Sequence, residues 1–265
     1  MTGFNQQGND RMFSLKGKKA LIVGVANSQS IAWGCAKAMK AQGAELALTY
    51  LNDKAKKHVA PLAEEADAAI FAPLDVTKPD EVDALYQQIE QVWGSLDILL
   101  HSIAFCPQAD LHGRVVDCSA EGFGVAMDIS VHSFLRLIRK SEPLMPSGSS
   151  VMTVTFHGSE KVISHYNIMG PVKAALESTT RYVAAELGQK GISVNALSPG
   201  PLATRAASGI ASFDEMLADA TQRAPTRKLA SIEDIGAYAA FLASDEARNI
   251  TGVVHPIDGG YRIIG

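Results

Sequence analysis

The chain has 265 residues, 47% hydrophobic and 20% charged, which suits one large α/β domain and excludes collagen, coiled coils and disordered proteins. The 24 basic and 28 acidic residues give a net charge of −4, which argues against nucleic acid as the main partner. The three cysteines show no metal-ligand spacing, so no metal site is expected. Without an apolar run of membrane length or a signal-peptide pattern, a soluble cytoplasmic protein is predicted.

After residues 1–14, which are interpreted as a flexible tail, short apolar runs rich in branched residues alternate with stretches of helical spacing. The apolar runs predict buried strands and the other stretches predict helices. In chain order we expect a strand at Lys19–Val25, a helix at Ile31–Gly43, a strand at Glu45–Tyr50, a helix at Lys54–Ala66, a strand at Ala69–Pro73, a helix at Pro79–Trp93, a strand at Leu96–Ser102, a helix at Ala120–Lys140, a strand at Ser149–Thr155, a helix at Asn167–Leu187, a strand at Ser193–Leu197, helices at Phe213–Arg223 and Ser231–Ala243, and a strand at Val253–Ile257.

This alternation of strands and helices predicts βαβ units and a parallel sheet covered on both faces. Seven strands in this order indicate a single doubly wound, Rossmann-type domain over residues 15–265. In such a domain the ligand lies at the carboxyl ends of the strands. The longest segment without expected structure is Ser198–Ser212, and loops of that length usually have a function.

Two local patterns could carry chemistry. The first strand ends at Gly24, and a tight turn that leads into a helix offers backbone N–H groups to a pyrophosphate. The usual G-x-G-x-x-G is absent, so an ordinary strand–helix turn is the alternative. Tyr166 and Lys173 are two helical turns apart and are expected on one helix face. A lysine beside a phenol lowers the phenol pKa, which makes Tyr166 a candidate donor, although such a pair also occurs by chance.

The context of the Tyr166 and Lys173 pair resembles the short-chain dehydrogenase/reductase family. The pair follows the fifth strand, Ile192–Pro201 runs from a strand into a Pro/Gly turn, and Asp75-Val76 ends the third strand. Within that family the chain resembles the NAD(P)H-dependent enoyl-acyl-carrier-protein reductases of bacterial fatty-acid synthesis, from about Leu15 to the C-terminus. The motifs that carry this resemblance are G-x5-S-I at Gly24–Ile31, T-Y-L-N-D-K at Thr49–Lys54, H-S-I-A-F at His101–Phe105, D-I-S at Asp128–Ser130, Y-N-x-M-G-x-x-K at Tyr166–Lys173 and S-x-G-P-x-x-T-x-A-A-S-G-I at Ser198–Ile210.

The resemblance implies a binding site for a nicotinamide dinucleotide. The residues that it assigns are Gly24, Ser30 and Ile31 to the pyrophosphate, Asp75 and Val76 to the adenine, Ser102, Ile103 and Ala104 to the nicotinamide ribose, Lys173 to the ribose hydroxyls, and Pro201, Leu202 and Thr204 to the carboxamide and phosphates. NADH is favoured over NADPH, because Asp53 follows the second strand where a 2′-phosphate would need Arg or Lys. Lys54, Lys56 and Lys57 lie further along and oppose this preference.

The resemblance also implies a reaction, in which hydride passes to the β-carbon of a 2-enoyl thioester carried on acyl carrier protein. Tyr166 would hydrogen-bond the thioester oxygen as charge develops there. A lid around residues 203–220 would cover the acyl chain, and the family habit is a homotetramer. The substrate contacts expected are Phe156, Tyr166, Met169, Ala206 and Phe213, with burial in the core as the alternative for Met169.

Three positions depart from the family pattern. Phe156 stands where enoyl reductases have a second tyrosine, and Ala104 stands where they have glycine. Thr153 stands where the carbonyl-reducing members have a serine. A carbonyl reductase or alcohol dehydrogenase that uses Thr153 is therefore one alternative, and a catalytically weak dinucleotide-binding sensor is another. We expect His101 to pack or cap a strand end rather than to act in catalysis.

Overall fold

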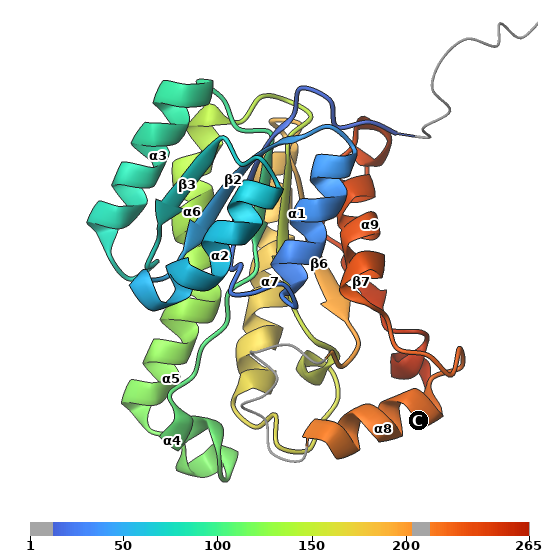
Figure 1. The fold of residues 1–265 in the computed structure, drawn as a ribbon. Coiled ribbons are helices and arrows are strands. Elements are labelled where there is room, and N and C mark those ends of the chain that lie inside the picture. The colour runs from blue at the N-terminus through green and yellow to red at the C-terminus, as the bar shows by residue number, and fades with distance from the viewer. Residues whose placement is uncertain (1–12, 203–212, 265) are drawn as a thin grey trace, which may run out of the picture.

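The computed structural model describes residues 13–202 and 213–264 of the chain. Seven parallel strands form one sheet in the order β3-β2-β1-β4-β5-β6-β7 (Figure 1). The order reverses between β1 and β4, which pair directly from Ala20 with Ile98 to Val23 with His101. This confirms the predicted doubly wound sheet. The strands are β1 (Lys19–Val23), β2 (Glu45–Tyr50), β3 (Ile70–Pro73), β4 (Ile98–His101), β5 (Ser150–Val154), β6 (Ser193–Pro199) and β7 (Val254–Ile257).

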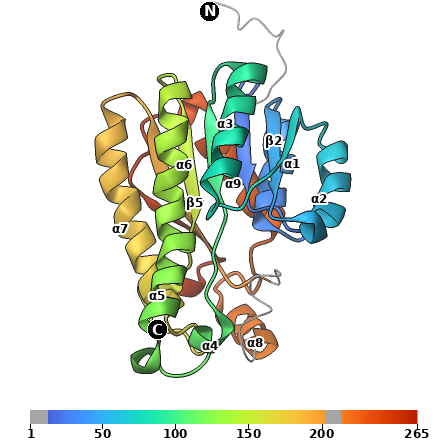
Figure 2. The ribbon, with the colours of Figure 1, turned by 90° about the vertical axis from the view of Figure 1, so that its left-hand side faces the viewer.

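Helices cover both faces of the sheet. One layer holds α3, α6 and α7, and the other holds α1, α2 and α9, as two views at right angles show (Figures 1 and 2). The short helix α4 and the helix α8 lie beyond the carboxyl edge of the strands. The helices are α1 (Ile31–Ala41), α2 (Asp53–Glu65), α3 (Pro79–Trp93), α4 (Gln108–Leu111), α5 (Ala120–Met127), α6 (Ser133–Ser141), α7 (Met169–Gly188), α8 (Phe213–Arg223) and α9 (Ile232–Leu242).

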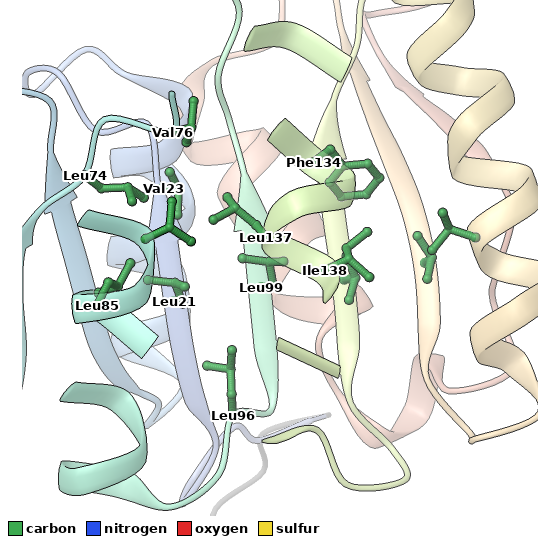
Figure 3. Packing of buried hydrophobic residues seen from close by; sticks show 14 of the residues in the cluster. Leu21, Val23, Leu74, Val76, Leu85, Leu96, Leu99, Phe134, Leu137 and Ile138 are labelled. Carbon is green, nitrogen blue, oxygen red and sulfur yellow. The ribbon is translucent and has the colours of Figure 1, made fainter. Parts of the chain in front are cut away.

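The two layers bury separate hydrophobic clusters because alternate residues of each strand point to opposite faces. Leu21 and Leu99 pack with α3, α6 and α7, whereas Ile22 and Leu100 pack with α1, α2 and α9. Figure 3 shows Leu21 and Leu99 on the strands, with Phe134 of α6 nearby. Strands that are apolar on both faces are typical of a buried parallel sheet.

Helices α1 and α9 cross at two glycines. A Cβ atom on Gly34 would lie 2.2 Å from the carbonyl oxygen of Ile232, and one on Gly236 would lie 2.3 Å from the carbonyl oxygen of Gly34. The absence of side chains therefore lets the two backbones approach. The helix α9 opens on a capping box, in which Ser231 and Asp234 each accept a bond from the other's backbone N–H.

Two predicted helices differ from the structure. The expected helix Ala120–Lys140 is divided into α5 and α6 by a π-helical turn at Asp128–His132. The expected helix Asn167–Leu187 begins later, at Met169, because Asn167 has a left-handed φ of 44°. Tyr166 therefore lies in the turn before α7, and the prediction that it shares a helix face with Lys173 was wrong.

Two predicted segments fall largely outside the described residues. Residues 1–12 of the expected tail are not described, whereas the ring of Phe13 packs against Phe241 with centroids 6.0 Å apart. Of the expected lid, residues 203–212 are not described, and the rest forms part of α8. Within the described ranges, no helix combines the length and the apolar character needed to span a membrane.

Candidate active site

The predicted site residues gather where the strands end. Gly24 follows β1, Asp75 and Val76 follow β3, Ser102 follows β4, and Phe156 follows β5 by two residues. Because all seven strands are parallel, these positions lie along one edge of the sheet.

The turn after β1 is built by a serine. Gly24 has a left-handed φ of +107°, and a Cβ there would lie 2.0 Å from the carbonyl oxygen of Ser102, so only glycine suits this position. The Ser30 hydroxyl accepts hydrogen bonds from the backbone N–H groups of Ala26 and Asn27, each at 3.0 Å. A side chain thus shapes a turn that the usual motif shapes with further glycines. Ile31 begins α1 directly after it.

Hydrogen bonds join the segment after β4 to the end of β1 and to the π-helical turn. The backbone N–H of Ser102 donates to Val23 at 2.9 Å, which joins the ends of β4 and β1. Ser102 and Ile103 are partly buried and Ala104 is exposed. The Ser130 hydroxyl, in the π-helical turn, bonds both the N–H and the carbonyl of Phe105 at 3.0 and 3.1 Å. The π-helical turn therefore fixes the segment predicted to line the nicotinamide ribose.

His101, the last residue of β4, is fully buried. Its Nδ1 lies 3.0 Å from the Thr153 hydroxyl and its Nε2 lies 2.8 Å from the Ser133 hydroxyl. Burial, with a smaller effect of the nearby Lys173 charge, lowers the pKa of His101 to about 3. A neutral imidazole with both nitrogens engaged confirms the packing role expected for His101. The bond to His101 also engages the hydroxyl of Thr153, which is a fully buried residue.

Hydrogen bonds of Asp75 and Val76 hold the loop that follows β3. The Asp75 carboxylate accepts from the Thr77 N–H at 3.0 Å, and the Asp75 N–H donates to Glu81 at 2.7 Å. The Val76 carbonyl accepts a bond from Arg136 of α6, and the same guanidinium pairs with Asp128 at 2.7 Å. Arg136 therefore joins the predicted adenine loop to the π-helical turn.

The rings of Phe156 and Tyr166 contact each other edge to face, with centroids 4.9 Å apart. Phe156 lies near the start of the loop after β5, and Tyr166 lies near its end. Burial raises the pKa of Tyr166 above its ordinary value, and the negative charge of Glu177 raises it further. The expected lowering of this pKa by Lys173 was therefore wrong. Within the described ranges, no side chain or carbonyl bonds the Tyr166 hydroxyl.

Lys173 lies in the first turns of α7 and is 5% exposed. Its ammonium donates to the Val154 carbonyl at 2.8 Å, at the end of β5. Burial lowers the pKa of Lys173 to about 8, against the opposing effect of Glu177. An ammonium has three N–H donors, so two remain for a ligand beyond the bond to Val154.

At the end of β2, the chain enters α2 through an acidic first residue. The Asn52 side chain accepts from the Ala55 N–H at 3.0 Å, and Asp53 begins the helix. Leu51, Asn52 and Asp53 are exposed. The Lys56 ammonium lies 5.4 Å from the centre of the Tyr50 ring, where a cation–π contact holds it.

The remaining predicted residues divide into three groups. Met169 is 6% exposed and belongs to the core cluster, which favours the core alternative for it. Pro201 is buried, and Leu202 packs against the cluster formed with α1 and α9. Thr204 and Ala206 lie outside the described residues, as does the side chain of Phe213, whose backbone begins α8.

Three residues of the site had no role assigned from the sequence. Ser130 stood in the D-I-S motif without a role, and Arg136 and Glu177 were not singled out. Arg136 and Ser130 act through contacts across 60 and 25 residues of chain, which no local pattern indicates. Glu177 is buried and accepts bonds from Thr155 and Ser159. Its spacing of four residues from Lys173 is a signal that the sequence did contain.

These groups suit a dinucleotide. The helix α1 has no acidic residue in its first turn. The N–H groups of Trp33 and Gly34 donate to the Ser30 carbonyl, and those of Ile31 and Ala32 meet no acceptor among the described residues. Its N-terminus is thus available to an anionic pyrophosphate. Lys173 has donors to spare for sugar hydroxyls, and Gly24 allows close approach at the junction of β1 and β4.

Comparison with known proteins decides the family. The family profile described as enoyl-(acyl carrier protein) reductase matches residues 24–262. The chain belongs to this family. It is therefore an oxidoreductase of the short-chain type, as the motifs predicted.

Individual relatives agree with this assignment. The chain is 45% identical to enoyl-acyl-carrier-protein reductase (NADH) 1 of Rhizobium meliloti over 251 residues, 95% of this chain and 92% of the relative. It is 45% identical to the crystal structure of the Aquifex aeolicus reductase (NADH), with a TM-score of 0.91 over 95% of this chain and 98% of that one. The Bacillus cereus reductase, solved with NADP+ and indole naphthyridinone, is 39% identical, with a TM-score of 0.93 over 96% and 100%.

Proposed function

We propose that this protein reduces the carbon–carbon double bond of a 2-enoyl thioester carried on acyl carrier protein, with NADH as the hydride donor. The observation that carries the proposal is the arrangement at the end of β5. Tyr166 presents a protonated phenol that is not bonded to the described chain, and Lys173 presents a buried ammonium with donors to spare. One residue can therefore bond the substrate oxygen while the other binds the cofactor ribose.

The roles of the chain's residues follow from the reaction. When NADH is bound, it supplies the hydride that reaches the β-carbon. Negative charge then develops on the thioester oxygen, and a hydrogen bond from the Tyr166 hydroxyl would stabilise it. A proton from water would then add to the α-carbon and complete the reduction of the double bond. A phenol with its ordinary pKa of about 10 is already protonated at neutral pH, and the raised pKa of Tyr166 leaves it a hydrogen-bond donor there. Phe156 supports the Tyr166 ring without donating a bond.

The contacts of Thr153 count against the carbonyl reductase. A ketone needs a proton delivered to its oxygen, and the first alternative used Thr153 as the assisting hydroxyl. That hydroxyl is fully buried and held by His101. An enoyl thioester needs only one hydrogen bond at its oxygen, and Tyr166 can supply it. The sensor alternative gives no reason for a protonated phenol and an ammonium at one strand end.

The cofactor preference is supported by Asp53 and by relatives named as NADH enzymes. The carboxylate at the start of α2 would repel a 2′-phosphate. Of the three lysines that oppose this preference, Lys56 lies over the Tyr50 ring. The NADP+ complex of the Bacillus cereus relative makes a direct comparison of both cofactors necessary.

The test is oxidation of NADH and of NADPH with a crotonyl thioester, beside a 3-oxoacyl thioester. We expect turnover of the enoyl substrate and little turnover of the ketone. Activity on the ketone alone would establish the carbonyl reductase instead. Tight cofactor binding without activity on either substrate would favour the sensor.

We also propose that the lid around residues 203–220 covers the acyl chain, and that the protein assembles as a homotetramer. Both proposals rest on the family resemblance. Sedimentation equilibrium would measure the oligomeric state, and a monomer would contradict the second proposal.

A further inference from the structure

Glu177 is a buried carboxylate to which the reaction gives no role. It is 5% exposed and lies on α7, four residues after Lys173, so that one helical turn separates two buried side chains of opposite charge. A charged group is almost never fully buried without partners, because leaving water costs several kcal/mol. The partners of Glu177 therefore indicate what it does.

The first partners are two hydroxyls of the loop that carries Tyr166. One oxygen of Glu177, Oε1, accepts from the Thr155 hydroxyl at 2.7 Å and from the Ser159 hydroxyl at 2.6 Å. Thr155 follows β5 directly, and Ser159 ends the short 3-10 helix at His157–Ser159. Glu177 therefore fixes the start of the loop at two points.

The same loop supports the Tyr166 ring. A Cβ added to Gly158 would lie 2.6 Å from Cδ1 of Tyr166, so the ring lies directly against that backbone. Gly158 precedes Ser159, which donates to Glu177. The Phe156 ring also contacts the Tyr166 ring, with the two centroids 4.9 Å apart. The position of Tyr166 thus depends on the segment that Glu177 anchors.

The second relationship is electrostatic. The groups whose charges act on or respond to Lys173 are Glu177 on its own helix and His101 on β4. His101 is held neutral by burial, because its pKa is about 3. Glu177 is the group that favours the protonated lysine and also the protonated tyrosine. Those are the protonation states that ribose binding and hydrogen-bond donation require.

We propose that Glu177 is a positioning residue of this site, which holds Lys173 as an ammonium and anchors the loop that supports Tyr166. The inference rests on the proposed function for the roles of Lys173 and Tyr166. It concerns a residue that touches neither substrate nor cofactor in that function.

The test is the pH dependence of NADH binding, followed by fluorescence. Wild-type affinity should fall as pH rises through about 8, where Lys173 loses its proton. Glu177→Gln keeps an oxygen for the two hydroxyls but removes the charge, so the midpoint should move down by about one pH unit or more. Glu186→Gln, the same change at an exposed position of α7, should leave the midpoint in place.

A Lys173→Arg protein separates the effect of the Glu177 charge on Lys173 from a structural effect of Glu177→Gln. Arginine stays protonated throughout this pH range. Lys173→Arg should therefore abolish the fall in affinity, and Glu177→Gln added to Lys173→Arg should leave the pH profile flat. An unchanged midpoint in Glu177→Gln, or a shift that persists beside Lys173→Arg, would overturn the inference.

If Glu177→Gln alone does not fold, thermal unfolding of Lys173→Met, with and without Glu177→Gln, tests the inference. Lys173→Met removes the positive charge one helical turn from the buried Glu177 carboxylate, which then rests on its bonds from the Thr155 and Ser159 hydroxyls. Adding Glu177→Gln to Lys173→Met should then raise the unfolding temperature, and an equal or lower temperature would overturn the inference.

The proposed function can fail separately. If the wild type reduces the crotonyl thioester and the Glu177→Gln midpoint does not move, only this inference fails. If the midpoint moves and neither thioester is reduced, the charge role stands and the proposed substrate fails. Absence of NADH binding by the wild type would overturn both.

Discussion

The rings of Phe156 and Tyr166 pack edge to face at 65°, with their centroids 4.9 Å apart. The two residues lie near the start and the end of the loop between β5 and α7, so the two ends of that loop contact each other. Phe156→Tyr adds a hydroxyl to this pair of rings, whereas Tyr166→Phe removes one, so the two substitutions are opposite changes.

We expect Tyr166→Phe to lower kcat by about 100-fold or more, which is typical for the loss of one oxyanion donor. NADH affinity should stay close to that of the wild type, because the hydroxyl is needed mainly as charge develops. Phe156→Tyr should leave kcat unchanged or raise it modestly. Single-turnover kinetics and fluorescence titration measure the two quantities. A Tyr166→Phe enzyme that keeps more than about a third of kcat, with chemistry rate-limiting, would remove Tyr166 as the donor.

Asp53 should set the cofactor preference from the start of α2. The wild type is expected to have a higher kcat/KM with NADH than with NADPH, and Asp53→Arg should move the ratio toward NADPH by about tenfold or more, because it replaces repulsion of a 2′-phosphate by attraction. Glu65→Arg, at the other end of the same helix, should leave the ratio unchanged. A wild type that prefers NADPH tenfold would contradict this prediction.

His101 should make the fold sensitive to acid. Its folded pKa of about 3 lies below the value of about 6.5 in the unfolded chain. As pH falls, the unfolded chain therefore binds the extra proton before the folded chain does. The stability that neutral His101 contributes to the fold is complete above about pH 6.5 and is lost as pH falls toward 3.

Urea unfolding at about pH 7.5 and about pH 5 measures this loss, which should reach about 2 kcal/mol for the wild type. In His101→Gln the difference between the two pH values should be smaller by that amount. The exposed His58→Gln is the matched control and should behave as the wild type does. Equal pH dependence in all three proteins would refute the assignment.

The crossing of α1 and α9 should not tolerate a methyl group. Gly34→Ala places Cβ 2.2 Å from the Ile232 carbonyl oxygen, so the helices must separate, and the free energy of unfolding should fall by about 1–3 kcal/mol. Gly124→Ala, in α5, meets no atom within 4 Å and should raise it by about 0.5–1 kcal/mol, because alanine favours helix. Urea unfolding compares the two. A neutral Gly34→Ala would mean that the helices can separate at no cost.

The alternation of elements and the seven strands followed from the sequence, because strand burial and helical spacing are encoded within a few neighbouring residues. The motif residues Gly24, Tyr166 and Lys173 could be singled out for the same reason. Their family, and with it the reaction class, followed from the order of those motifs along the chain.

The tertiary structure alone decided how these residues are held. It placed Tyr166 before α7 rather than on it, because Asn167 takes a left-handed conformation that the helix pattern does not reveal. It divided the expected long helix at Asp128–His132, and it turned the Thr153 hydroxyl to His101, across 52 residues of chain. Protonation was decided there too, since the pKa of Tyr166 depends on burial and on Glu177. Burial and charge contacts act through space, whereas periodicity and motifs report only what is near along the chain.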